Sequence, residues 1–224
     1  MGKIRGVIFD LDGTLIDTLE TYTLAFNQGI EAFNLKPISK EKLATLLNRA
    51  LPLEDILLEL FPTPFKEKEA RLKCLEEIRK AYTELEKNVK LKPGVEEVLP
   101  KLREMGMKIG IATARTTSGE AKWLELRRLG IDHFIDAMVT AAEAERKPAI
   151  GSLIECIKRL GLSPAECVLV GDSQSDVLTG KAAGVMTIAL PTGVASKEDL
   201  CRENPETIID SLTALPDFIS HLSH

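Results

Sequence analysis

Short apolar runs alternate along this chain with longer segments in which apolar residues recur at helical spacing. A run that is apolar at every position is typical of a strand buried on both faces, and its alternation with helices is typical of a parallel sheet covered by helices on both sides. The pattern predicts an α/β fold with a doubly wound, mostly parallel sheet. The expected strands are residues 4–9, 108–112, 137–139, 167–170 and 187–190.

Glycines mark the expected ends of several helices. Gly130 follows a helical pattern that begins at Ser118, Gly161 follows one over 148–160, and Gly184 follows one that ends at Ala183. Glycine is common just after a helix because the left-handed conformation found there carries no side-chain penalty. Residues 163–166 have the form of a capping box, but a strand is expected immediately afterwards, so we expect a tight turn.

The alternation is interrupted between residues 18 and 90. This stretch shows only amphipathic helical pattern, broken by prolines, and alternation resumes at residues 91–94. We therefore expect an α/β core made of residues 1–17 and 91–224, with a helical cap domain over residues 18–90. The insert starts directly after the first strand and its loop, which places it over the carboxyl ends of the strands, where open α/β sheets bind their ligands.

Composition and charge remove several classes of function. The chain has 224 residues, 44% of them hydrophobic, which suffices for one sizeable core and a smaller second unit. Its net charge is -5 and its basic residues are dispersed, so nucleic acid is not an expected partner. The four cysteines form no CxxC pair, which fits neither a zinc site nor a disulfide framework. With no signal-like leader and no apolar run near ~20 residues, we expect a soluble, cytoplasmic protein without membrane contact.

The first candidate motif is DLDGT at residues 10–14, directly after an apolar strand. An Asp-Gly pair is often only a turn. Two carboxylates where a buried strand emerges favour a functional site, because Gly13 permits close backbone approach and Thr14 offers a hydroxyl.

Two further motifs are ambiguous by themselves. Thr113 ends a second strand, where it could cap the next helix; alternatively its hydroxyl and neighbouring backbone N–H groups, such as that of Ala114, could orient a phosphate oxygen. Lys147 precedes Pro148 in a charged stretch and could simply be solvated ahead of a helix. Its place between two strands nevertheless puts it within reach of the same sheet edge.

The fourth motif is GDSQSD at residues 171–176. Asp172 stands directly after an apolar strand and a glycine, whereas Asp176 also fits a capping box that begins at Ser173. If Asp10, Asp12, Asp172 and Asp176 converge, they repel one another unless a cation offsets them, and all-oxygen ligands favour Mg²⁺. Lys147 supplies further positive charge.

Taken in order, these motifs resemble the haloacid dehalogenase superfamily in its phosphatase branch, with phosphoglycolate phosphatase-like proteins as the nearest group. The resemblance implies that Asp10 is the nucleophile and that Asp12 is the general acid and base. It implies that Thr113 and Lys147 bind the phosphoryl group. Mg²⁺ would be held by Asp172 and Asp176, together with Asp10 and the backbone carbonyl of Asp12.

The resemblance thus predicts a Mg²⁺-dependent phosphatase acting on a small phosphate ester such as phosphoglycolate, as a monomer or small homo-oligomer. Asp12 favours phosphoryl transfer, because the dehalogenases and phosphonatases of the superfamily depart at that position. A phosphomutase of the same fold and an inactive regulatory or binding module are the alternatives. Within the cap, Arg49 is the candidate substrate contact, or else a surface arginine. Ala114-Arg115 and Ile150 depart from the pattern of related phosphatases.

Overall fold

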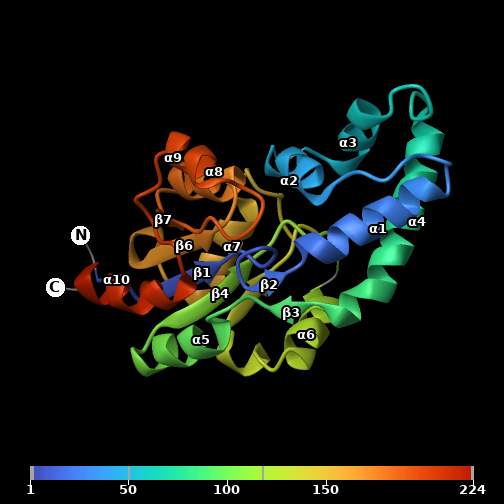
Figure 1. The fold of residues 1–224 in the computed structure, drawn as a ribbon. Coiled ribbons are helices and arrows are strands. Elements are labelled where there is room, and N and C mark those ends of the chain that lie inside the picture. The colour runs from blue at the N-terminus through green and yellow to red at the C-terminus, as the bar shows by residue number, and fades with distance from the viewer. Residues whose placement is uncertain (1–2, 50, 118, 223–224) are drawn as a thin grey trace. The chain divides into compact units, whose positions relative to one another are not determined.

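The computed structural model describes residues 3–49, 51–117 and 119–222. Contacts between Cα atoms divide the chain into two compact units. The larger comprises Met1–Ile16 and Leu91–His224, and the smaller is Asp17–Lys90. Each unit is described by itself below (Figure 1).

The larger unit is built on a parallel sheet with the strand order β5-β4-β1-β6-β7-β8. Its strands are β1 (Gly6–Phe9), β4 (Lys108–Ala112), β5 (Ala137–Val139), β6 (Cys167–Gly171), β7 (Met186–Ala189) and β8 (Thr207–Ile208). The five strands expected from the sequence are present, each within two residues of its expected ends, and the α/β fold class is confirmed. The additional edge strand β8 was not expected.

The central strand β1 aligns the carboxyl ends of its neighbours. Phe9 lies opposite Ile111 of β4 on one side and opposite Val170 of β6 on the other. All four residues of β1 are buried, in keeping with its unbroken apolar sequence. The residues that follow these three strands therefore emerge together at one edge of the sheet.

Helices cover both faces of this sheet (Figure 1). On one face α7 (Gly151–Leu160) and α8 (Gln174–Ala183) pack against each other and the strands; on the other lie α5 (Val95–Glu104) and α10 (Leu215–Leu222). The remaining helices are α6 (Gly119–Arg128), α9 (Lys197–Arg202) and the 3₁₀ turns Asp132–Phe134, Pro164–Glu166 and Leu212–Ala214. Apolar side chains of α7 and the sheet, such as Leu153, Ile157 and Ile8, are buried together in the core.

The glycine signals in the sequence correspond to helix ends. Gly161 and Gly184 adopt left-handed backbone conformations directly after α7 and α8, and Gly130 also has a positive φ. The helix expected from Ser118 is seen from Gly119 onward, and Ser118 itself lies outside the described residues.

Two local expectations need correction. The helix after Pro148 begins only at Gly151, so the proline lies in the preceding turn and not at the first helical position. Residues 163–166 form one 3₁₀ turn with capping-box contacts, because the Glu166 carboxylate accepts from both the backbone N–H and the hydroxyl of Ser163. The tight turn was expected there, but its capping box was not.

The smaller unit is helical. It contains α1 (Leu19–Glu31), α2 (Lys40–Asn48), α3 (Leu53–Leu60), α4 (Lys68–Leu85) and the 3₁₀ turn Glu86–Asn88. Its core includes Phe26, Ile56, Phe65 and Ile78. The chain enters and leaves this unit through β2 (Ile16–Asp17) and β3 (Lys90–Leu91), which pair with each other.

Within the described residues, the structure contains no helix that combines the length and the apolar character needed to cross a bilayer.

Candidate active site

The chain positions the candidate residues by extending its strands. The backbone N–H of Asp10 donates to the carbonyl of Val170 at 2.8 Å, one residue past the end of β1. Beyond the end of β4, the N–H of Thr113 donates to the carbonyl of Val139 at 3.0 Å. Asp10 and Thr113 are therefore fixed by backbone bonds at the carboxyl edge of the sheet.

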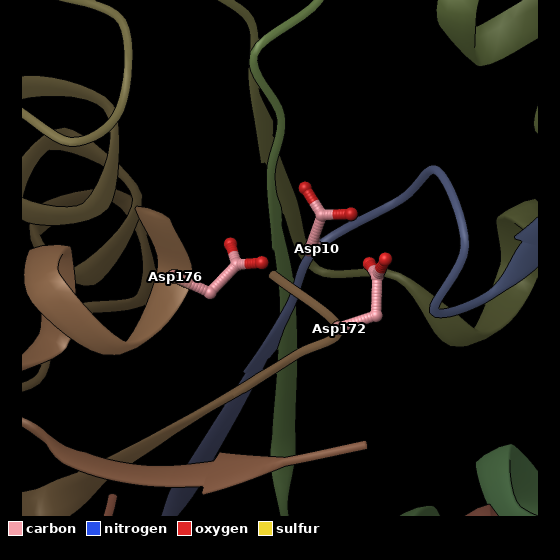
Figure 2. A group of neighbouring side chains, drawn as sticks. All are labelled: Asp10, Asp172 and Asp176. Carbon is pink, nitrogen blue, oxygen red and sulfur yellow. The ribbon is translucent and has the colours of Figure 1, made fainter. Parts of the chain in front are cut away.

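Three aspartates gather at this edge (Figure 2). Asp10, Asp172 and Asp176 each offer a carboxylate oxygen, and these oxygens lie within 4.8 Å of one another. All three residues are buried, with at most 6% of their surface exposed. A group of oxygen ligands this close together suits a hard divalent cation.

Lys147 links two members of this cluster. Its ammonium donates to Oδ1 of Asp10 and, at 2.5 Å, to Oδ1 of Asp176. Burial alone would lower the pKa of Lys147, but the carboxylates of Asp10 and Asp176 raise it above its usual value, so the side chain remains charged. The lysine expected at this sheet edge thus lies within hydrogen-bonding distance of Asp10.

Asp176 is both a member of the aspartate cluster and part of a helix cap, the two roles that its sequence position left open. Its Oδ2 accepts from the backbone N–H of Ser173 at 3.1 Å and from the Ser173 hydroxyl at 2.6 Å, which completes a capping box at the start of α8. Its Oδ1 meanwhile faces Lys147. The cap fixes the carboxylate so that one oxygen is presented to the cluster.

Asp172 is held by Thr14, whose hydroxyl the sequence had pointed to, and by Val194, which sequence reasoning missed. The hydroxyl of Thr14 donates to its Oδ1 at 3.0 Å, and the backbone N–H of Val194 donates to its Oδ2 at 2.9 Å. Gly13, with φ near +88°, and Gly193 both approach so closely that a Cβ at either position would overlap the Asp172 carboxylate. Gly13 belongs to the DLDGT motif already singled out, whereas the signal of Gly193 was slight, since a Thr-Gly pair after a strand usually indicates only a turn.

The electrostatics of the cluster favour a bound cation. Burial raises the pKa of Asp10 well above its usual range, and the carboxylates of Asp176 and Asp172 add to this against the opposing charge of Lys147. Burial, followed by repulsion from Asp176, raises the pKa of Asp172 to about 7. Three ionised carboxylates and one ammonium leave two negative charges, which a single Mg²⁺ would balance. These residues therefore fit the expected metal.

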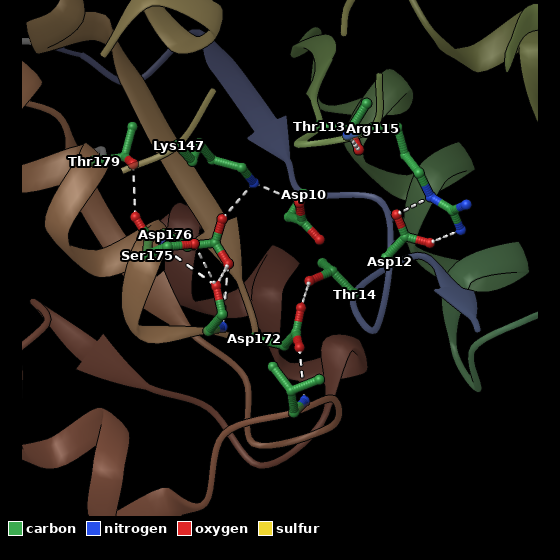
Figure 3. A network of polar contacts seen from close by, with 12 residues as sticks. Asp10, Asp12, Thr14, Thr113, Arg115, Lys147, Asp172, Ser175, Asp176 and Thr179 are labelled. Carbon is green, nitrogen blue, oxygen red and sulfur yellow. Dashed lines mark hydrogen bonds and ion pairs between the residues drawn. The ribbon is translucent and has the colours of Figure 1, made fainter. Parts of the chain in front are cut away.

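Asp12 does not join the cluster through its side chain. Figure 3 shows its carboxylate turned toward Arg115, which donates from Nε to Oδ2 at 2.7 Å and from Nη2 to Oδ1 at 2.5 Å. The expected metal contact of Asp12 was its backbone carbonyl, and that contact stays a prediction. Sequence reasoning noted Arg115 only as a departure from the phosphatase pattern and did not foresee this pair.

The remaining candidates lie in different surroundings. Thr113 is fully buried, and its hydroxyl accepts from the N–H of Arg115 at 3.2 Å; it does not cap α6, which begins only at Gly119. Ala114 follows it directly and is half-buried. In the smaller unit, Arg49 caps the end of α2 and pairs with Glu59 at 2.7 Å, with both side chains nearly half exposed. The substrate role of Arg49 stays a prediction.

Comparison with known proteins agrees with this geometry. The family model of haloacid dehalogenase-like hydrolases matches residues 7–190. Phosphoglycolate phosphatase 1 of Pseudomonas aeruginosa is 31% identical over 219 residues, covering 94% of this chain and 78% of its own. Pyrophosphatase PpaX of Halalkalibacterium halodurans is 28% identical over 218 residues, covering 97% of each.

The fold agrees as well. A haloacid dehalogenase-like family hydrolase from Streptococcus pneumoniae superposes with a TM-score of 0.83 at 20% identity, covering 100% of both chains. The family match runs from the second residue of β1 to just past β7 and includes every aspartate of the cluster. The chain therefore belongs to the haloacid dehalogenase-like hydrolase family, and its relatives place it among the phosphatases of that family.

Proposed function

We propose that this protein is a Mg²⁺-dependent phosphatase that hydrolyses a small phosphorylated metabolite through an aspartyl-phosphate formed on Asp10. The observation that carries the proposal is the buried cluster of Asp10, Asp172 and Asp176 with Lys147 bonded between two of its members. A carboxylate is a competent nucleophile toward phosphorus once positive charge offsets the negative charge of the phosphate.

The cluster supplies that positive charge and the position of the nucleophile. Asp172 and Asp176, with Asp10 and the Asp12 carbonyl, would hold Mg²⁺, which when bound supplies charge neutralisation for the phosphoryl oxygens. Lys147 keeps one oxygen of Asp10 oriented and adds a second positive charge beside the phosphoryl group. Asp10 attacks phosphorus with its other oxygen.

Other residues complete the reaction. The Thr113 hydroxyl and the N–H of Ala114 orient phosphoryl oxygens at the end of β4. Asp12 protonates the oxygen of the leaving group and later accepts a proton from the water that hydrolyses the aspartyl-phosphate. Free phosphate and the dephosphorylated metabolite are the products.

We propose phosphoglycolate as the first substrate to test, because one relative is named a phosphatase of that compound. Pyrophosphate is the next, from the name of the other. The unit Asp17–Lys90 is proposed to act as a cap that selects the substrate, since it departs from the core within a few residues of Asp10 and Asp12.

The test is Asp10→Asn, which preserves the shape of the side chain and removes its charge. We expect kcat on phosphoglycolate to fall by on the order of a thousandfold or more, as for loss of other catalytic nucleophiles. Asp132→Asn, a carboxylate paired at the surface with Arg127, serves as the matched control and should retain activity.

Two results would contradict the proposal. Near wild-type hydrolysis by Asp10→Asn would exclude Asp10 as the nucleophile. Substrate loss without an equal release of free phosphate would indicate a phosphomutase, which returns the phosphate to a sugar.

A further inference from the structure

The second aspartate of the DLDGT motif is held by an arginine. Both nitrogens of the Arg115 fork, Nε and Nη2, donate to the two oxygens of Asp12, at 2.7 and 2.5 Å. The Arg115 side chain is 8% exposed and that of Asp12 is 25% exposed. A bidentate pair in such partial burial is a firm contact.

The backbone of Arg115 is fixed by two hydrogen bonds. Its N–H donates to the Thr113 hydroxyl at 3.2 Å, and its carbonyl accepts from the N–H of Ala141 at 2.8 Å. These bonds anchor the residue at the carboxyl edge of the sheet. A change of partner at the guanidinium would therefore be a rotation of the side chain about a fixed backbone.

The pair conflicts with the role proposed for Asp12. In the observed arrangement both oxygens of Asp12 are acceptors for the guanidinium. Proton transfer to a leaving oxygen requires one of them to carry a proton and to face the substrate. The fork stabilises the ionised carboxylate of Asp12, so opening the pair would free an oxygen of Asp12 for this transfer.

Arg115 is also suitably placed to bind part of a substrate. Figure 3 shows the Asp12–Arg115 pair on one side of Asp10, with Lys147 and Asp176 on the other. A guanidinium fork matches a carboxylate or a phosphate as well as it matches Asp12. An anionic group on the leaving part of the substrate would compete with Asp12 for the same donors.

We propose that the Arg115 guanidinium, which pairs with Asp12 in this structure, exchanges Asp12 for a second anionic group on the leaving part of the substrate. This exchange of partners frees Asp12 for proton transfer. The inference rests on the proposed function and narrows its substrate class to small phosphates that carry a second carboxylate or phosphate. Arg115 acts as a positioning and specificity residue, and Asp12 remains the group that moves the proton.

Binding of inert analogues gives the first test. Phosphonoacetate carries a carboxylate beside its phosphonate, whereas methylphosphonate lacks it. Calorimetry with Mg²⁺ should show wild-type protein binding phosphonoacetate at least about tenfold more tightly, the factor that corresponds to 1.4 kcal/mol. Arg115→Gln should bind the two analogues about equally. Arg103→Gln, which removes an Arg–Asp pair at the same 2.5 Å distance on the surface, should keep the preference.

Kinetics give the second test. For Arg115→Gln we expect kcat/KM on phosphoglycolate to fall by about 30-fold or more, the lower limit for truncating one partner of a buried charge pair. The loss on p-nitrophenyl phosphate, which has no second anion and a leaving group that needs no proton, should be at least about tenfold smaller. Arg115→Lys, which keeps the charge and loses the fork, should lie between wild type and Arg115→Gln.

Specific outcomes overturn the inference. The first is an equal loss of kcat/KM on both substrates in a folded Arg115→Gln or Arg115→Lys. The second is an unchanged preference for phosphonoacetate over methylphosphonate in either variant. The third is no such preference in the wild-type protein. The last measurement applies even if Arg115→Gln does not fold. Wild-type protein that hydrolyses p-nitrophenyl phosphate but no ester with a second anionic group would overturn this inference alone. Wild-type protein that hydrolyses no phosphate ester would overturn the proposed function as well.

Discussion

The backbone at Gly193 lies so close to the carboxylate of Asp172 that a Cβ there would overlap it, and the N–H of the next residue, Val194, donates to the same carboxylate. The nearby hydroxyl of Thr192 donates to the carbonyl of Gly13 at 3.0 Å, which joins this loop to the turn after β1. Asp172 is thus positioned by Thr14 and Val194, neither of which belongs to the aspartate cluster. Such supporting contacts orient a metal ligand.

Gly193→Ala should therefore weaken metal binding without abolishing the fold. The added Cβ must displace the Asp172 carboxylate, and changes in groups that support metal ligands commonly cost 10- to 100-fold in metal affinity. We expect the Mg²⁺ concentration for half-maximal activity to rise by about tenfold or more. A titration of activity against Mg²⁺ measures this.

Gly106→Ala is the matched control. Gly106 has φ near +75°, and a Cβ there would meet no atom within 4 Å. This variant should lose some stability and keep the wild-type Mg²⁺ dependence. An equal shift in both variants would mean that the effect is one of general destabilisation.

The residues of the cluster could be anticipated from sequence because each follows an apolar strand or lies between two strands. Parallel strands end at one edge, so strand ends alone bring Asp10 and Asp172 together. The pair between Asp12 and Arg115 could not be anticipated, because 103 positions separate them and neither residue type indicates a specific partner. The contact depends on how two loops turn after leaving β1 and β4.

At the scale of elements, agreement with the sequence depends on length and pattern. The strands of four or five residues were apparent as apolar runs, whereas β2, β3 and β8 contain two residues each and leave no periodic signal. The ends of α7 and α8 were well anticipated because each is followed by a glycine in the left-handed conformation. The start of α7 was misplaced because a proline can precede a helix as well as begin it.

The helix end at Gly161 can be tested directly. Gly161 has φ near +66° after α7, and a side chain in this conformation is strained. Gly161→Ala should reduce the free energy of unfolding by about 1 kcal/mol. Gly161→Asn should cost less, because asparagine tolerates the left-handed conformation better than alanine.

Urea unfolding followed by circular dichroism would compare these variants with wild type. Activity per folded molecule should be unchanged in both, since Gly161 lies at the far end of α7 from the turn that carries Lys147. A larger loss for asparagine than for alanine would contradict the conformational explanation.

At the scale of the whole molecule, the aspartate cluster links stability to the metal. The three buried carboxylates repel one another more than one lysine can offset, and a divalent cation would relieve this repulsion. Mg²⁺ at one hundred times its Kd should therefore stabilise the folded state by about 2.7 kcal/mol and raise Tm. Scanning calorimetry with Mg²⁺ and with excess chelator measures the difference.

Asp10→Asn provides the internal comparison for this effect. In chelator the variant should melt above wild type, because one buried charge has been removed, and Mg²⁺ should raise its Tm by less. Chelation should also remove wild-type activity reversibly, with Mg²⁺ restoring it better than the larger Ca²⁺. Full activity in excess chelator, or a chelated Asp10→Asn that melts below chelated wild type, would contradict the metal assignment.

The central position of β1 also affects how the chain matures as it leaves the ribosome. Gly6 pairs with Lys108 on one side and with Cys167 on the other. The first strand of the sheet to be synthesised can therefore pair only with strands that are synthesised about 100 and 160 positions later. The helical unit Asp17–Lys90 is synthesised before either partner strand. Because domains generally fold as units during synthesis, we expect this inserted unit to acquire its structure before the sheet does. Asp10, the proposed nucleophile at the end of β1, should then be among the last groups to reach its working position.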